Sequence, residues 1–184
     1  MNGARLVAPL LVALGCLSTA HDAGARSCIC EGSFVDNARR ADLVVRAKAK
    51  GFDGLWGNGR PRNVRFEVTR VFNGDPSLAT VLVEGDDGNS LRRDASGFEA
   101  GSEWLLDLHY SRATTSNGRR IVVYEVSVCG SHALRIEKGV VAASGCEDSD
   151  DGKPVGEVVD RLRAALTAPA DPTPAAAATP APER

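Results

Sequence analysis

Alternation of apolar and polar residues in short, regularly spaced segments is the feature that most constrains the fold of this chain. An apolar residue at every second position is typical of a β-strand with one buried face. The predicted strands are 42–50, 64–72, 80–83, 103–110 and 120–129. Turn-forming glycine, asparagine and proline residues separate them. Because no helix long enough for a parallel crossover lies between them, the sequence predicts a mainly β domain, a small antiparallel barrel or sandwich.

The first and second strands carry the clearest patterns. In the first strand one face is apolar, with Leu43, Val45, Ala47 and Ala49. In the second strand Val64, Phe66 and Val68 share a face, but Val71 comes one position late. Such a slip predicts a β-bulge, which bends a strand in a small barrel.

The fourth strand separates two kinds of side chain. Trp104, Leu106, Leu108 and Tyr110 alternate with a polar face that carries Glu103, Asp107 and His109. Trp104 is therefore predicted to lie in the core. Trp56, on a glycine-rich loop, is either a binding aromatic or a packed one.

Helices are predicted on both sides of the strands. Ser33 is a capping residue for a short helix at 34–40. Near the other end Pro154 starts a segment whose apolar residues have amphipathic helical spacing. These residues are Val155, Val158, Val159, Leu162 and Leu166. We expect this second helix to pack on the β domain.

The C-terminal part is divided by composition. The acidic run 147–152 is interpreted as a solvated linker, so that 147–167 comprises a linker and the C-terminal helix. A calcium loop fits the run less well, because its aspartate spacing is wrong and Val158 stands where such a loop needs glutamate. Residues 168–184 are almost all alanine, proline and threonine, which predicts a disordered tail.

The N-terminal segment 1–27 has the pattern of a secretory signal peptide. Arg5 is followed by an apolar stretch too short to cross a bilayer, and small residues come next. Cleavage after Ala20, Ala25 or Ser27 satisfies the preference for small residues. Cys16 also fits a lipoprotein attachment site in part, since Gly15 precedes it. Export predicts a secreted or periplasmic protein without a membrane span.

Composition and motifs exclude several functions. The 184-residue chain has a net charge of −2, and removal of 1–27 changes it to −3, which does not indicate nucleic-acid binding. The three histidines, His21, His109 and His132, are scattered, and no motif for a nucleophile or a phosphate loop is present. The sequence therefore predicts one domain that is not an enzyme and has no cofactor.

Four cysteines remain after the leader: Cys28, Cys30, Cys129 and Cys146. An even number in an exported chain is typical of disulfides, and three pairings are possible. Cys28 and Cys30 are one residue apart, so on an extended chain they point to opposite sides and each should find a distant partner.

These features together resemble the inhibitory domain of the tissue inhibitors of metalloproteinases, a netrin-like module. The Cys-x-Cys start, the first strand and the last two cysteines carry most of the likeness. The similar segments are 28–30, 41–48, 56–58, 64–74, 101–105, 128–129 and 144–146. The resemblance covers residues 28–146 and implies a five-stranded antiparallel OB-like barrel.

The family implies a mechanism and disulfides. By resemblance, the amine and carbonyl of an N-terminal Cys28 chelate the zinc of a target metalloprotease, Ile29 enters the substrate pocket, and Cys30 completes the inhibitory contact. Cys30 would pair with Cys129. The family partner of the first cysteine is missing from 91–97, so Cys28 is expected to pair with Cys146.

Two functional hypotheses follow. The first is a secreted inhibitor of zinc metalloendopeptidases, which requires cleavage after Ser27 so that the amine of Cys28 is free. The second is a non-inhibitory secreted OB-fold binding module whose disulfides are structural only.

Overall fold

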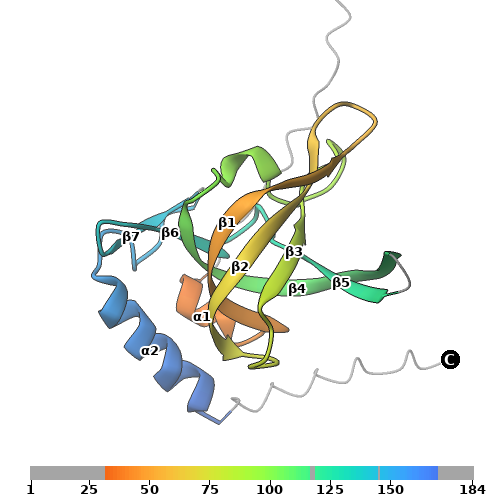
Figure 1. The fold of residues 1–184 in the computed structure, drawn as a ribbon. Helices are drawn as coiled ribbons and strands as arrows, with labels where there is room; N and C mark the ends of the chain where they lie inside the picture. The colour runs from red at the N-terminus through yellow and green to blue at the C-terminus, as the bar shows by residue number, and fades with distance from the viewer. Residues whose placement is uncertain (1–31, 117–118, 145, 170–184) are drawn as a thin grey trace, which may run out of the picture.

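A computed structural model of the protein describes residues 32–116, 119–144 and 146–169. These contain two α-helices, one short 3-10 helix and seven strands (Figure 1). The helices are α1 (Phe34–Ala38), α2 (Val155–Thr167) and the 3-10 turn η1 (Ala95–Gly97). The strands are β1 (Leu43–Leu55), β2 (Pro61–Asn73), β3 (Thr80–Glu84), β4 (Glu103–Ser116), β5 (Arg119–Glu125), β6 (Ala133–Glu137) and β7 (Val140–Ala143). The mainly β prediction is confirmed.

The strands form one sheet whose central part closes into a ring of five. The order along the sheet is β1-β2-β3-β5-β4-β6-β7, and β1 pairs with β4 as well. Every pairing is antiparallel except that of β3 with β5, which is parallel. The predicted antiparallel pairing therefore holds everywhere except between these two strands. Strand directions cannot alternate around an odd-numbered ring, so one neighbouring pair must be parallel.

The prediction of five strands is also incomplete, because β6 and β7 extend the sheet beyond β4. These short strands form a hairpin across Lys138 and Gly139, both of which have positive φ angles, 50° and 85°. Two such residues match the twist of a tight hairpin. The strands have only five and four residues, too few for a clear alternation.

The predicted bulge in the second strand is confirmed. Arg46 pairs with Arg70, and the next residue, Ala47, pairs with Val68, so Thr69 is an extra residue in β2. Its hydroxyl donates a hydrogen bond to the carbonyl oxygen of Arg46 at 3.0 Å. The bulge reverses the side-chain alternation of β2 and helps β1 and β2 to curve.

Two apolar cores lie on opposite faces of the sheet. The ring encloses the first, which contains the four predicted apolar residues of β1 and also Trp104, Phe66 and Phe98. Phe98 stacks edge-on against both other rings, with centroid distances of 5.2 Å to Phe66 and 4.8 Å to Trp104. The prediction that Trp104 is a core residue is confirmed.

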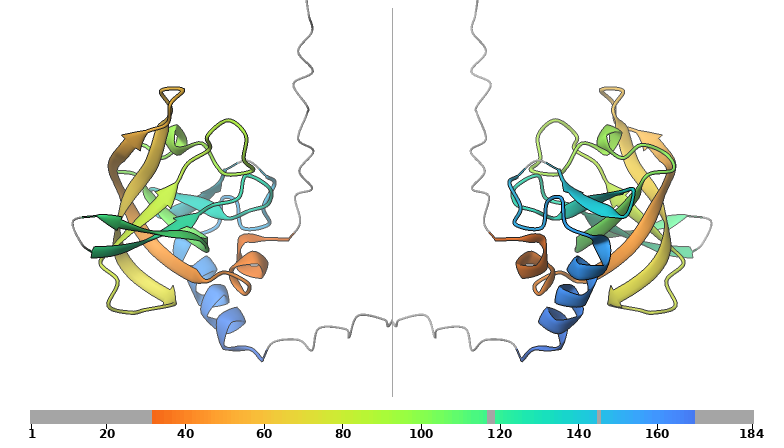
Figure 2. Two further views of the ribbon diagram at one scale, coloured as in Figure 1. Left: turned by 90° about the vertical axis from the view of Figure 1, so that its right-hand side faces the viewer. Right: turned by 90° about the vertical axis from the view of Figure 1, so that its left-hand side faces the viewer.

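The second core lies between the outer face of the sheet and the two helices, which Figure 2 shows side by side. Val158, Val159 and Leu162 of α2 are buried there, together with Phe34 of α1 and Leu105 of β4. The predicted C-terminal amphipathic helix and its packing are therefore confirmed, and so is the short N-terminal helix, which has Ser33 as its N-cap.

Candidate functional site

The start of α1 is fixed by one buried carboxylate. Asp148 Oδ2 accepts a hydrogen bond from the backbone N–H of Phe34 at 2.9 Å and another from the hydroxyl of Ser131. The side-chain amide of Asn37 donates to the carbonyl of Ser131 at 3.3 Å. Asp148 and Ser131 lie two residues after Cys146 and Cys129, respectively. The first turn of α1 therefore touches the segments that follow both cysteines.

These contacts correct one prediction. The acidic run 147–152 is only partly a solvated linker, because Asp148 is 9% and Asp150 0% exposed, whereas the other four residues are exposed. Asp150 forms ion pairs with Lys153 and with Arg161 of α2. Sequence pattern missed this role because charged residues are buried only when partners distant in sequence satisfy them.

Cys129 and Cys146 are both disulfide-bonded. Their predicted partners, Cys28 and Cys30, lie outside the described residues, as do Ile29, the leader residues 1–27 and the tail 170–184. The predicted pairings and the predicted cleavage sites therefore stay predictions. Phe34, which is held by Asp148, follows Cys30 by only four residues.

Two exposed apolar side chains lie beside Cys129. Leu91 and Val128 are 50% and 42% exposed, and the N–H of Val128 donates to the carbonyl of Leu91 at 2.9 Å. We call this pair the apolar ledge. Arg93, two residues further on, donates to the carbonyl of Ser144 at 2.7 Å. The loop that follows β3 is thus joined to the segments of both described cysteines.

A buried acid–imidazole pair supports the loop that carries Cys129. Asp107, on β4, is completely buried, and its Oδ1 lies 2.6 Å from Nδ1 of His132. The other ring nitrogen, Nε2, lies 3.0 Å from the carbonyl oxygen of Cys129. Burial raises the pKa of Asp107, an effect that the contact with His132 partly offsets.

Gly130 makes this arrangement possible. Its φ angle of +104° disfavours any residue with a side chain, and an added Cβ would lie 2.9 Å from Nε2 of His132. The loop therefore passes close to the imidazole ring only because glycine stands at this position.

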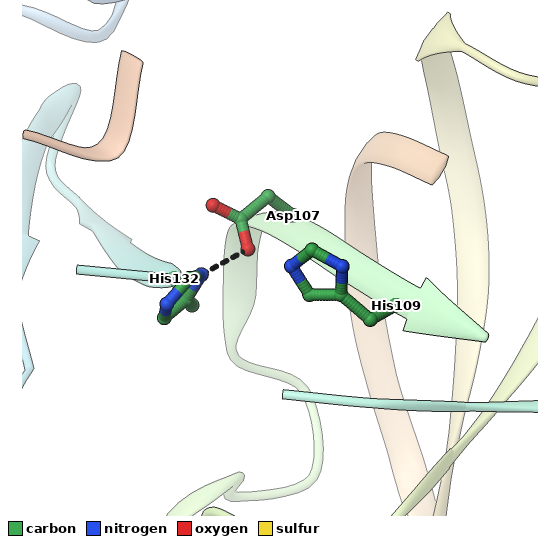
Figure 3. Close-up of side chains that lie close together, drawn as sticks. All are labelled: Asp107, His109 and His132. Carbon is green, nitrogen blue, oxygen red and sulfur yellow. Dashed lines mark hydrogen bonds and ion pairs between the residues drawn. The ribbon is translucent and has the colours of Figure 1, made fainter. Parts of the chain in front are cut away.

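His109 completes a cluster around Asp107. Asp107 and His109 are two residues apart on β4, so they project from the same face of the strand. The rings of His109 and His132 are 5.8 Å apart and nearly perpendicular. Figure 3 shows the carboxylate of Asp107 between the two rings. One ligand atom from each of the three residues lies within 4.8 Å of the others, which is a geometry that can hold a metal ion.

The sequence did not predict this cluster. Two of the three histidines, described above as scattered, meet in the folded chain. The pattern Asp107-x-His109 on the polar face of a predicted strand was a usable signal for two of its three residues. His132 carried no such signal, because only the pairing of Leu106 with Ala133 brings it to β4.

A separate cavity opens between β2, β3 and β5. Its volume is about 520 Å³, and Leu43, Leu78, Leu82, Ile121 and Tyr124 are among the residues that line it. Asp42, Arg65 and Asp75 supply polar groups at its wall. A mainly apolar cavity with a few polar groups is typical of a small-ligand site.

The sequence matches no protein-family model and shows no significant similarity to a curated protein. Among the described residues, no helix has both the length and the apolar character needed to cross a membrane.

Proposed function

We propose that this protein is a secreted inhibitor of zinc metalloendopeptidases whose mature chain begins at Cys28. The observation that carries the proposal is the position of α1. Its first turn contacts the segments after Cys129 and Cys146 through Asp148, and both cysteines are disulfide-bonded. Phe34 follows Cys30 by four positions, which span at most about 14 Å. This short connection supports the proposed pairing of Cys30 and Cys28 with these two cysteines.

An OB-like barrel is the fold that we propose for the domain. The ring β1-β2-β3-β5-β4, closed through β1 and β4, supports it. OB-folds are five-stranded, partly open barrels of this kind, and their loops commonly bind partners.

The proposed inhibition uses the amine nitrogen and the carbonyl oxygen of Cys28. A zinc protease keeps one coordination position for the water that attacks the substrate. A free α-amine has a pKa of about 7.7–8.0, so it can lose its proton to a zinc ion near neutral pH. Ile29 would follow into the pocket that normally receives a substrate side chain, and an apolar residue suits such a pocket.

The apolar ledge supports a protein partner for this region. Leu91 and Val128 are exposed and adjoin Cys129, the proposed partner of Cys30. Apolar side chains exposed beside a binding element add buried area to an interface. We therefore assign them to the contact with the protease surface around its active site.

The test compares two forms of the exported protein that differ by one residue. The form that starts at Cys28 should inhibit zinc metalloendopeptidases in a panel, whereas a form that retains Ser27 should not, because its Cys28 nitrogen is an amide. Intact mass gives the natural N-terminus. Equal inhibition by both forms, no inhibition of any zinc protease by the Cys28 form, or a natural start at His21 or Arg26 would each refute chelation by Cys28.

The second candidate is a non-inhibitory binding module, and the cavity between β2, β3 and β5 favours it. In that case the cavity would bind an apolar group, and the cysteines would only stabilise the fold. Leu82→Arg, which places a charge in the cavity wall, should abolish ligand binding in this module but should leave protease inhibition unchanged.

A further inference from the structure

Asp107, His109 and His132 take no part in the proposed inhibitory contact. Asp107 and His109 lie on β4, and His132 lies just before β6. The carboxylate is fully buried, and the two imidazoles are partly exposed. We propose that these three side chains bind one divalent transition-metal ion, with Zn²⁺ as the best-fitting ion.

The contacts of His132 require a proton or a metal ion between its ring and Asp107. The carbonyl of Cys129 can only accept, so Nε2 of His132 carries a hydrogen. Nδ1 then faces the carboxylate oxygen Oδ1 at 2.6 Å. Two lone pairs cannot face each other at this distance. A proton must lie between them, or a metal ion must replace it after a small separation of the two atoms.

The proton alone leaves one buried oxygen of the cluster without a partner among the described residues. Asp107 Oδ2 is buried and has no hydrogen-bond partner in the part of the chain that the structure describes. No described residue forms a hydrogen bond with the ring of His109 either. A buried oxygen without a partner costs about 1–3 kcal/mol. A cation bound by all three side chains would give the ring of His109 a partner and would neutralise the carboxylate of Asp107.

The distances allow this exchange. Ligand atoms around a tetrahedral zinc are about 3.3 Å apart, given bonds of roughly 2.0–2.2 Å. The three ligand atoms already lie within 4.8 Å of one another. Side-chain movements on the order of 1 Å would bring them into a coordination sphere, and water would fill the remaining position.

The surroundings of His132 match those of a metal-binding histidine. Such a residue usually donates its second ring N–H to a carbonyl or a carboxylate, which fixes the tautomer and the ring orientation. The bond from Nε2 to the carbonyl of Cys129 does this, and it directs Nδ1 toward Asp107. Gly130 leaves the space that the bond needs.

Two imidazoles and one carboxylate favour a first-row transition metal. Imidazole suits Zn²⁺, Cu²⁺, Ni²⁺ and Fe²⁺, whereas Ca²⁺ and Mg²⁺ prefer oxygen ligands. Through His132 and the carbonyl of Cys129, the bound ion would also restrain the loop that carries the apolar ledge residue Val128. This site is independent of the proposed chelation of a protease zinc by Cys28.

Calorimetric titration of the full exported protein with ZnCl₂ tests the site. We expect one zinc ion per chain and an affinity that falls at least about tenfold in His109→Ala. His109 is partly exposed, so its removal should leave the fold intact. The matched control is Asp53→Ala, which removes an exposed carboxylate outside the cluster and should bind zinc as the wild type does. N-terminal acetylation should likewise have no effect.

Nitrogen NMR of the histidine rings gives a second readout on the unaltered chain. Addition of zinc should shift the ring nitrogens of both His109 and His132. The proposal is refuted if the protein binds no zinc, if His109→Ala retains full affinity, if acetylation or Asp53→Ala abolishes binding, or if zinc leaves both ring signals unchanged.

Discussion

Glu84 is a buried carboxylate at the parallel junction of the ring, where β3 pairs with β5. It lies at the end of β3, is 3% exposed, and accepts two hydrogen bonds from the guanidinium of Arg112 at 2.9 Å and 2.8 Å. Ser111 donates to its other oxygen at 3.1 Å, and Arg92 lies 3.5 Å away. A buried carboxylate is tolerated here because β4 and the loop that carries Arg92 supply donors.

We predict that Glu84→Ala lowers the free energy of unfolding by about 3 kcal/mol, because the partly buried Arg112 loses its counter-charge. Chemical denaturation of the purified variant measures this. The matched control is Asp53→Ala, which breaks an exposed ion pair with Arg65 and should cost less than about 1 kcal/mol. Equal losses in the two variants would show that burial does not decide the strength of these pairs.

Among the elements, α1 is short and depends on its cap. Ser33 and Asp36 form a reciprocal capping box, in which the hydroxyl of Ser33 accepts from the N–H of Asp36 and the Asp36 carboxylate accepts from the N–H of Ser33. The hydroxyl and the backbone N–H of Ser33 lower the pKa of Asp36 below 3.8. Because α1 has only five residues, it has little stability of its own.

We predict that Ser33→Ala lowers the free energy of unfolding by about 1 kcal/mol. The contribution of Asp36 is present above its unfolded pKa of 3.8 and is lost as the pH falls through its lower folded pKa. The stability advantage of the wild type over Asp36→Asn should therefore shrink between pH 5 and pH 2. Denaturation curves of both proteins across this range measure it, and a constant difference would contradict the assignment.

The elements also show what the sequence could predict. The apolar positions of β1 and the late Val71 of β2 identified the curved strands, because burial on one face leaves a period of two. In β4 the alternation did not predict burial correctly. Tyr110, on its apolar face, is 50% exposed, while Asp107, on its polar face, is fully buried. The second core covers this face of β4, and the acidic residues Asp148 and Asp150 are buried near it. Such burial depends on tertiary partners, which no local pattern contains.

At the scale of the whole molecule, the predicted disulfides would join the two ends of the domain. We predict that the pairs are Cys30 with Cys129 and Cys28 with Cys146, and that each closes a loop of about a hundred residues. Peptide mapping without reduction identifies the pairs. A peptide that links Cys28 to Cys129, or Cys28 to Cys30, would contradict the prediction.

Loss of either predicted bridge should lower the free energy of unfolding by about 4–5 kcal/mol in the chain-entropy model. Cys28→Ser and Cys146→Ser should be equally destabilising, and the double variant should be no worse than either one, because all three lack the same bond.

The double pairing of β1 has a consequence for how the chain folds. β1 binds β2, its neighbour in sequence, but also β4, so that Leu43 meets Leu108 across 65 positions. The hairpin of β1 and β2 can form early, whereas the ring closes only after β4 has found the free edge of β1. Contacts so distant in sequence slow folding to milliseconds or longer. Until that closure, the unpaired edge of β1 is exposed, and this interval is when the chain is most vulnerable to aggregation.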